Sequence, residues 1–429
     1  MNHLSLRIRL VAMNFLEFAV WGAYLTSMGS YLVRVGLAES IGWFYAMQGI
    51  VSIFMPGLMG VVADRWVPAQ RLLGCCHFLA GAFMAAAAFY GMQAGAAVDM
   101  APLFTLYAFS VAFYMPTLAL SNSVAFNGLT RVGLDTVKDF PPIRVFGTVG
   151  FICSMWAVDV FGFQTTYQQF FVSAALSLVL GLYAQTLPSC PVGSGERKSL
   201  SDALGLRAFK LFKERRLAVF FLFSILLGVS LQITNGFANP YIMSFENIPL
   251  YADTFGASHP NVLISLSQIS EACCILLIPF FLKRFGIKRV MLIAMLAWVL
   301  RFALFGFGDP GNGLWMFILS MIVYGVAFDF FNVSGALYVD SSTEPDIRSS
   351  AQGLFMIMTN GLGATIGTLG AQAVVNHFVY NVPAELQLEG WRTSWFIFAA
   401  YSAVVFLLFA FSFREHRSGS AAQARDARQ

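Results

Sequence analysis

The sequence predicts an all-α polytopic membrane protein whose twelve transmembrane helices form two pseudo-symmetric six-helix bundles. Three observations support this fold class. The chain of 429 residues is 58% hydrophobic and 11% charged, whereas soluble domains carry about 25% charged residues. Its apolar residues are gathered into twelve runs that are each long enough to cross a bilayer. Its Lys and Arg residues are concentrated in alternate loops between those runs.

The composition also argues against several other classes of protein. With so little polar surface, the chain does not resemble a soluble enzyme, a nucleic-acid-binding protein or a disordered protein. Five of the six cysteines lie in apolar runs, and none has C-x-x-C or Cys/His ligand spacing. We therefore expect small buried thiols and neither a disulfide scaffold nor a metal site.

Six apolar runs fill the first part of the chain. The first follows a short basic N-terminus and is longer than the apolar core of a cleavable signal, so we expect it to remain as a helix. The second ends at Asp64-Arg65, which we interpret as a turn and a charge latch between helices. The fifth follows Pro141-Pro142 and begins at Arg144. The predicted helices span residues 9–32, 41–62, 71–93, 101–124, 144–165 and 168–187.

Six more runs follow the longest polar interruption, which covers residues 188–217. We therefore expect an N-terminal bundle over 1–187, a cytoplasmic linker over 188–217, a C-terminal bundle over 218–413 and a basic tail over 414–429. The predicted helices of the second set span residues 218–240, 259–282, 288–307, 313–338, 349–375 and 393–413.

The basic residues predict the orientation. Of the 26 Lys and Arg, 22 fall in loops or termini on the side of the N-terminus, and Arg34 and Arg392 alone fall on the other side. By the positive-inside rule, both termini are then cytoplasmic; the resemblance given below implies that the membrane is a bacterial inner membrane. The split also supports twelve spans, because a missed helix would reverse the later loops.

A faint internal repeat relates the two halves. Tyr114 and Tyr324 are each followed eight residues later by Asn, in the fourth and tenth predicted helices. Paired six-helix halves are typical of transporters that bind substrate near the midplane between them. Chance similarity is the alternative explanation.

Polar residues inside the apolar runs require an explanation, because a charge near the bilayer centre costs about 2.5–3.5 kcal/mol. Glu271 lies in the middle of the eighth run, and Gln268 lies three residues earlier on the same helical face. They either bind a substrate or form a structural hydrogen bond between helices.

Two other runs offer polar pairs. Gln232 and Asn235 present amides that suit a neutral, multiply hydrogen-bonding solute such as a sugar or a nucleobase, and a structural role is the alternative. Asn239 and Pro240 follow one turn later, where a proline can break the helix and free backbone carbonyls. In the tenth run, Tyr324 and Phe328 share one face as a stacking wall or as ordinary packing, beside Asp329.

Three more charged residues lie within or near the runs. Arg144, followed by Thr148 and Phe151, either neutralises a buried acid, contacts a substrate or anchors the helix at the interface. Glu17 is an unpaired acid in the first run, with a functional or a structural role open. We interpret Arg301, in the ninth run, as structural.

The chain lacks enzyme motifs in a usable context, including HExxH, the P-loop, GxSxG and the dinucleotide fingerprint. Residues 188–217 are too few for a nucleotide-binding domain, which argues against an ATP-driven pump. A buried acid that exchanges a proton is the remaining device for energy coupling.

Several stretches resemble a known family. Residues 60–65, with the sequence Gly-Val-Val-Ala-Asp-Arg, are similar to the loop motif after the second helix of the major facilitator superfamily. Across nearly the whole chain, the sequence more specifically resembles the bacterial nucleoside:proton symporters, the nucleoside permease group. The matching stretches are 109–122, 139–148, 227–235, 265–271, 284–288, 324–334 and 348–353.

The resemblance implies a set of site residues. A nucleoside is expected to be surrounded by Arg144, Thr148, Phe151, Gln232, Asn235, Gln268, Glu271, Tyr324 and Phe328. Its ribose would face the acid and the amides, and its base would face the aromatic wall. Asp329 is implied in proton coupling or in the conformational change, together with Glu271. Glu17 stands where the broad-specificity branch of the family has Gln, so it could carry a second proton.

The sequence thus predicts a secondary active transporter that imports nucleosides with protons by alternating access. We expect a monomer in the lipid bilayer, with no cofactor other than the coupling proton, no enzymatic activity and no nucleic-acid partner. Two alternatives stay open. One is a major facilitator transporter of another small polar solute, such as a sugar or a drug. The other is a membrane sensor that transports nothing.

Overall fold

The computed structural model describes residues 3–190, 192, 206–343 and 348–413. The predicted basic tail, 414–429, and much of the predicted linker, 188–217, lie outside these residues. Throughout the described part of the chain, the regular structure is helical.

The N-terminal bundle follows the order of the predicted runs. Its long helices alternate in direction, and short turns connect them. The helices are α1 (His3–Gly22), α2 (Met28–Arg34), η1 (Ala38–Ser40), α3 (Ile41–Arg65), α4 (Ala69–Ala94), α5 (Met100–Tyr114), α6 (Thr117–Arg131), α7 (Thr136–Val160) and α8 (Gln168–Ala184).

The C-terminal bundle repeats the plan with more short helical segments. Its helices are η2 (Leu206–Lys213), α10 (Arg215–Leu231), α11 (Ile233–Ser244), η3 (Phe245–Asn247), α12 (Phe255–Ser258), α13 (Pro260–Phe285), α14 (Ile287–Phe307), α15 (Leu314–Ser342), α16 (Arg348–Met356), η4 (Ile357–Gly363), α17 (Ala364–Val375), η5 (Asn376–Tyr380), η6 (Ala384–Leu386) and α18 (Gln387–Ser412).

The described residues contain ten helical stretches that are long and apolar enough to cross a membrane. Adjoining helices such as α5 and α6 count as one stretch. Helix α8 is apolar but shorter, with 17 residues. The remaining span consists of α1 and α2, where Arg7, Arg9 and Glu17 lie within the 20 residues of α1. Together these stretches give the twelve predicted crossings.

Three of the predicted helices are interrupted. Residues 23–27 form a turn between α1 and α2, and Met115-Pro116 separates α5 from α6. Pro116 has no N–H to continue the backbone ladder, and the Thr117 hydroxyl donates to the carbonyl oxygen of Tyr114 at 2.5 Å. The predicted helix 218–240 breaks at Gln232. The helix does not break at Pro240, because α11 continues through this residue.

Helix α7 also differs from its predicted bounds of 144–165. It begins at Thr136 and contains both Pro141 and Pro142. The fixed φ of proline is compatible with a helix, so the pair removes backbone hydrogen bonds near the start without ending the helix. Arg144 therefore lies inside the helix and not at its start.

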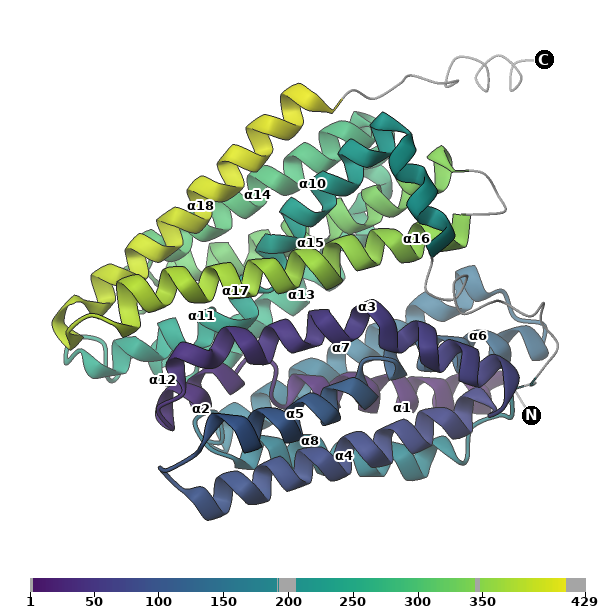
Figure 1. Cartoon of the computed structure of the whole chain (residues 1–429), viewed down its shortest axis with the longest axis horizontal. Helices are drawn as coiled ribbons and strands as arrows, with labels where there is room; N and C mark the ends of the chain where they lie inside the picture. Colours follow the sequence, from purple (N-terminus) through teal and green to yellow (C-terminus); the bar gives the residue numbers. More distant parts are fainter. Residues whose placement is uncertain (1–2, 191, 193–205, 344–347, 414–429) are drawn as a thin grey trace.

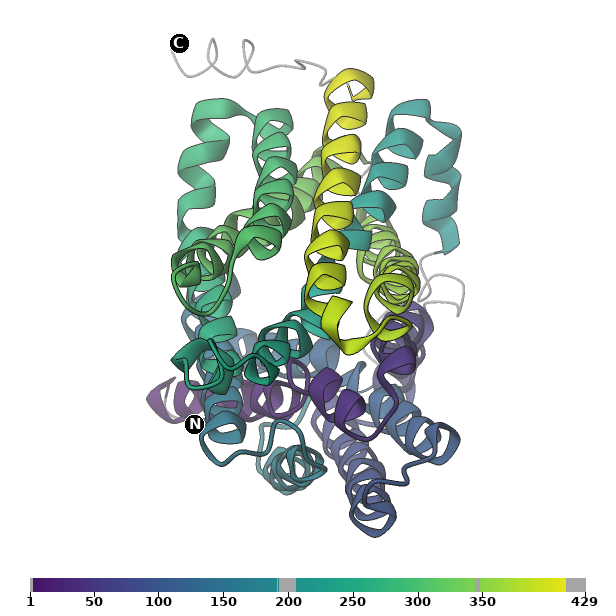
Figure 2. The ribbon, with the colours of Figure 1, turned by 90° about the vertical axis from the view of Figure 1, so that its left-hand side faces the viewer.

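The two bundles lie side by side, with α1–α8 below and α10–α18 above in the view of Figure 1. Helix α1 begins at the right-hand side of this view, and α18 rises from the left-hand side toward the top; we call the end of the molecule at which α1 begins the terminal end. The turns after α2, α7 and α11 lie at the other side, the opposite end, which faces the viewer in Figure 2.

The bundles are joined at the opposite end. Helix α2 packs against α11, and a Cβ atom on Gly29 would lie 2.5 Å from the carbonyl oxygen of Gly236 and 2.9 Å from Cγ of Pro240. Only glycine allows so close a crossing. On the neighbouring pair of helices, the Gln372 side chain of α17 accepts from the backbone N–H of Gly42 at 2.5 Å.

A buried network of polar side chains accompanies this packing. The Asn239 side chain accepts from the Ser30 hydroxyl at 2.5 Å and donates to Gln164 and Asn261 at 2.9 and 2.8 Å. Asn261 also accepts from Thr26 at 2.9 Å. The hydrogen bonds between the bundles that the described residues make all lie in the half of the molecule nearer the opposite end.

Candidate functional site

The predicted site residues come from both bundles. Arg144, Thr148 and Phe151 lie along α7, and Gln268 and Glu271 lie on α13, which packs against α7. Glu271 is eleven residues from the first residue of α13, which places it about 16 Å along the helix from the opposite end. This level is close to the middle of a membrane-spanning helix.

Arg144 faces the interior between the bundles. Its guanidinium carbon lies 3.8 Å from the centre of the Phe18 ring on α1, in cation–π geometry. It interacts electrostatically with Glu271 in the other bundle and with Glu17 in its own. Since Arg144 is eight residues past the start of α7, its position differs from that of an interfacial anchor.

Two carboxyl groups of the C-terminal bundle lie near this cation. Glu271 is half-buried and makes no hydrogen bond or ion pair with another described residue. Asp329 on α15 is 4% exposed, and its Oδ2 atom has no hydrogen-bond partner. The two acids interact electrostatically with each other. Carboxylates without partners can accept hydrogen bonds from a ligand or take up a proton.

An aromatic wall lies beside these acids. The rings of Tyr324 and Phe328 stack with their centroids 5.5 Å apart and their planes at 20°. Tyr324 interacts electrostatically with both Glu271 and Asp329, so the wall and the acids belong to one site. Arg301 supports the wall from behind, with its guanidinium carbon 4.5 Å from the centre of the Tyr324 ring.

Arg301 is wholly enclosed by the C-terminal bundle, with 2% exposure. It donates to the carbonyl oxygen of Ser320 at 2.7 Å and to the Ser267 hydroxyl at 3.4 Å. These contacts tie α14 to α13 and α15, in agreement with the structural role that the sequence suggested.

The amide pair of the seventh span forms a separate unit. The Asn235 side chain donates to the Gln232 side chain at 2.7 Å, at the junction of α10 and α11. Both residues are half-buried, and among the described residues no hydrogen bond joins them to Glu271. Asn239, by contrast, is buried in the network at the opposite end, away from a substrate at mid-membrane depth.

Glu17 has partners that the sequence did not indicate. Its Oε2 atom lies 2.9 Å from Nε2 of His77 on α4, and its Oε1 atom accepts from the Thr117 hydroxyl at 2.6 Å. Both Glu17 and His77 are 0% exposed. His77 could have been noticed as the imidazole in the predicted helix 71–93, although its position alone names no partner.

Trp21 is a second residue that the sequence analysis missed. It lies one turn after Glu17 on α1, and its ring centroid is 6.1 Å from that of Tyr114 and 6.2 Å from that of Phe151. Its indole N–H donates to the Gln48 side chain at 3.2 Å. The half-buried indole thus places an aromatic surface in the N-terminal bundle next to Phe151. Its spacing of four residues from Glu17 was the available signal.

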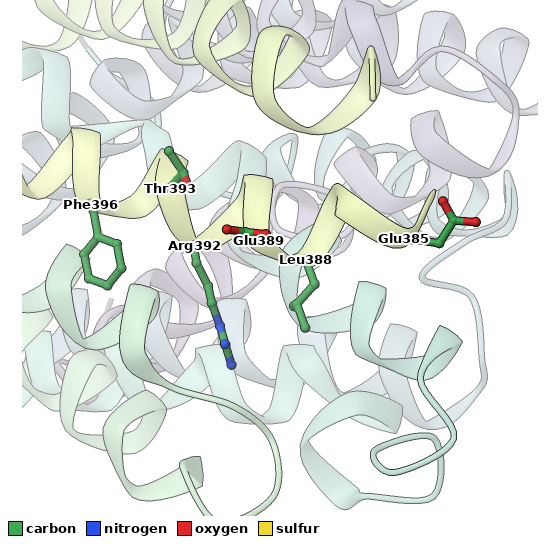
Figure 3. Close-up of a pocket in the computed structure, with 6 residues that line it drawn as sticks. All are labelled: Glu385, Leu388, Glu389, Arg392, Thr393 and Phe396. Atoms are coloured by element: carbon green, nitrogen blue, oxygen red, sulfur yellow. The ribbon is translucent and has the colours of Figure 1, made fainter. Parts of the chain in front are cut away.

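A surface hollow of about 490 Å³ lies elsewhere in the molecule (Figure 3). It is formed by η6 and the first turns of α18, and none of the predicted site residues contributes to it. Its lining residues are Glu385, Leu388, Glu389, Arg392, Thr393 and Phe396. The hollow is separate from the charged site between the bundles.

The profile of a family described as nucleoside H+ symporter matches residues 4–418. The xanthosine permease of Escherichia coli (strain K12) is 44% identical over 415 residues, which cover 96% of each chain. The nucleoside permease NupG of the same organism is 44% identical over 412 residues, which cover 95% of each chain.

Solved structures agree with these similarities. A crystal structure of NupG superposes with a TM-score of 0.87 at 44% identity, covering 97% of this chain and 100% of that chain. A D-xylose–proton symporter superposes with a TM-score of 0.70 at 14% identity, covering 96% and 99%. At that identity, the second superposition concerns the fold alone.

Proposed function

The chain belongs to the nucleoside H+ symporter family, and we propose that it imports nucleosides through the space between its two bundles by alternating access. It is a multi-pass membrane protein and a proton-coupled nucleoside transporter, not an enzyme. Family membership also decides against a sugar carrier, a drug carrier or a sensor, the alternatives that the sequence left open.

The observation that carries the proposed site is the electrostatic interaction of Arg144 with Glu271 across the bundle interface, together with that of Glu271 with Tyr324. A nucleoside combines ribose hydroxyls, which donate to a carboxylate, with a flat base, which stacks on an aromatic ring. We therefore place the ribose at Glu271 and the base at Tyr324 and Phe328.

The remaining predicted residues complete this site. Gln232, Asn235 and Gln268 carry amides that both donate and accept hydrogen bonds, which suits the edge of a base or the ribose. Thr148 and Phe151 lie one and two turns after Arg144 on the same helix and line its side of the interface. A site divided between two bundles is closed by their approach, as alternating access requires.

We assign the transported proton to the acids of the C-terminal bundle. Glu271 and Asp329 have no hydrogen-bonding partner for at least one oxygen, and they repel each other when both are ionised. A proton on either acid removes this repulsion. Loading of proton and nucleoside together would then neutralise the site and permit the bundles to rock.

The orientation follows from the charge distribution. With 22 of 26 Lys and Arg on the side of the N-terminus, the terminal end faces the cytoplasm of a bacterial inner membrane. Because the inter-bundle hydrogen bonds of the described residues lie toward the opposite end, we infer that the described conformation is closed to the exterior.

The direct test measures uptake of labelled uridine, adenosine and xanthosine in cells that lack their own nucleoside carriers. We expect uptake of at least one of them, faster at acid than at neutral external pH because the proton is a co-substrate, and abolished by a protonophore. Uptake that the protonophore does not change would contradict proton coupling. Failure to take up any of the three nucleosides would contradict nucleosides as the substrate class.

Glu271→Gln tests the site within the same assay. The amide keeps the size of the side chain but cannot release a proton or attract Arg144 as an anion, so accumulation should fall at least tenfold. Glu246→Gln, at an exposed position outside the site in the same bundle, is the matched control and should keep uptake. Full accumulation by Glu271→Gln would remove this residue from the mechanism.

A further inference from the structure

A carboxyl and an imidazole face each other inside the N-terminal bundle, away from the acids assigned above. Nε2 of His77 lies 2.9 Å from Oε2 of Glu17, and neither side chain has accessible surface. Ionisable groups at this depth are expensive and usually functional. A purely structural bond between α1 and α4 needs only neutral side chains, as Ser173 of α8 demonstrates by donating to the carbonyl oxygen of Val20 at 2.8 Å.

We propose that Glu17 and His77 form a second proton-binding site, in which His77 takes up one proton in each transport cycle. This inference rests on the proposed function and adds a residue, His77, and a bundle to the proton chemistry. In the unloaded state, Glu17 is a carboxylate and His77 is neutral. One added proton converts His77 into an imidazolium that is paired with the same carboxylate, so the site gains one positive charge and breaks no covalent bond.

The Ser177 hydroxyl allows His77 to be satisfied in both states. Its oxygen lies 3.0 Å from Nδ1 of His77 and 3.0 Å from the His77 carbonyl oxygen. When His77 is neutral with its hydrogen on Nε2, the hydroxyl donates to Nδ1. When His77 is an imidazolium, the hydroxyl turns to the carbonyl oxygen and accepts from Nδ1–H.

The Thr117 hydroxyl provides the same freedom to Glu17. It lies 2.6 Å from Oε1 of Glu17 and 2.5 Å from the carbonyl oxygen of Tyr114. It can therefore donate to the carboxylate or turn away from it, as the charge of the pair requires. Thr117 is also the first residue of α6, at the break beside Pro116. The pair is thus attached to an interrupted helix.

The proton on this pair would change the electrostatics of the substrate site through Arg144. That cation interacts electrostatically with both Glu17 and Glu271. Without the added proton, the pair carries one negative charge and competes with Glu271 for Arg144. With the proton, the pair is neutral overall, and Arg144 is free to attract Glu271 across the bundle interface. The proton therefore strengthens the contact that closes the site around a nucleoside.

Few other titratable groups face the pair. Tyr114, at the end of α5, donates its hydroxyl to the carbonyl oxygen of Glu17 at 2.8 Å. Cys76 is adjacent to His77 on α4 and interacts electrostatically with Glu17, as Arg144 of α7 does. Among the described residues, neither the phenol nor the thiol makes a hydrogen bond with the carboxyl or the imidazole, so the geometry places the added proton between Glu17 and His77.

The test compares proton-to-nucleoside ratios of the full chain in proteoliposomes. The ratio is obtained from the membrane potential at which a fixed nucleoside gradient produces no net flux. We expect a ratio one proton lower in Glu17→Gln and in His77→Gln than in the natural sequence. With one proton fewer, the maximal accumulation ratio falls about tenfold for each ~59 mV of proton-motive force. An unchanged ratio in both variants would overturn the proposal.

A second comparison avoids variants that remove a charge from the interior. Ser177→Ala removes the hydroxyl that can bond His77 in both of its protonation states. Ser173→Ala removes a buried hydroxyl one turn away on the same helix, and this hydroxyl donates to the Val20 carbonyl oxygen. The measurement is nucleoside binding as a function of pH. Ser177→Ala should shift this pH profile, whereas Ser173→Ala should leave it unchanged. Identical profiles for Ser177→Ala and the natural sequence would refute a titrating His77, even if nucleoside uptake itself is proton-driven.

Discussion

Replacing Asn239 by leucine should weaken the closed opposite end and increase the fraction of molecules that open there. Asn239 is fully buried and makes three side-chain hydrogen bonds. Two of them, with Ser30 and Gln164, reach the N-terminal bundle, and the third stays within the C-terminal bundle. Because the bundles must separate at this end when the protein opens outward, the two crossing bonds exist only in the described conformation.

The expected size follows from these bonds. Hydrogen bonds between membrane helices contribute about 0.6 kcal/mol on average and up to about 1.7 kcal/mol, and a buried partner left without a bond costs more. Two crossing bonds therefore favour the closed end by about 1–3 kcal/mol, which changes the ratio of open to closed molecules roughly 5–150-fold.

The assay is a distance measurement between spin labels at exposed positions of the two bundles, such as Arg34 and Leu250, with the native cysteines replaced. Asn239→Leu should increase the population with the longer distance. Asn14→Leu is the matched control, because Asn14 is equally buried but donates only to Leu10 of its own helix. The reasoning fails if the distances in Asn239→Leu stay unchanged, or if Asn14→Leu changes them equally.

Three further outcomes are expected. Tyr324→Ala should raise the KM for nucleoside uptake roughly 5–150-fold, because stacking on a base contributes about 1–3 kcal/mol, whereas Tyr324→Phe keeps the ring and should stay near the natural value; equal KM values would contradict the stacking role. Asp329→Asn mimics a permanently protonated acid, so nucleoside exchange should persist while accumulation driven by a proton gradient falls by the contribution of one proton, and undiminished accumulation would assign that proton elsewhere. Gly29→Val places a Cβ atom 2.5 Å from the Gly236 carbonyl oxygen. It should therefore lower the thermal unfolding temperature and lengthen the distance between the spin labels at Arg34 and Leu250. An unchanged distance distribution would contradict the close crossing of α2 and α11.

Some structural features escaped prediction because they depend on packing between helices. Proline often accompanies a helix break, and one occurs at Pro116 inside the predicted helix 101–124, where none was predicted, whereas α11 continues through Pro240. At Pro240, α2 lies close enough for Gly29 to cover the carbonyl oxygen of Gly236, the one that the proline leaves without its helical N–H partner. The break that does occur, at Gln232, has no such signal.

The pairing of polar residues was equally hidden. Glu17 and His77 are 60 positions apart, and Asn239 and Ser30 are 209 apart. A hydropathy pattern shows that each is a costly polar residue in an apolar run, but it does not show which run lies beside it. For this reason the sequence could raise Glu17 as a candidate and Asn239 as a helix-breaking neighbour, but could not name their partners.

By itself, the sequence determined the membrane class, the twelve crossings and the likeness to nucleoside symporters. These properties are additive along the chain, because bilayer insertion depends on the apolar content of each segment and orientation depends on the charges of each loop. The tertiary structure decided which ionisable groups interact: Arg144 lies within electrostatic range of Glu271 and Glu17, and Glu17 contacts His77. It also decided which end is closed, because these contacts form only where helices distant in sequence are brought within hydrogen-bonding or electrostatic range.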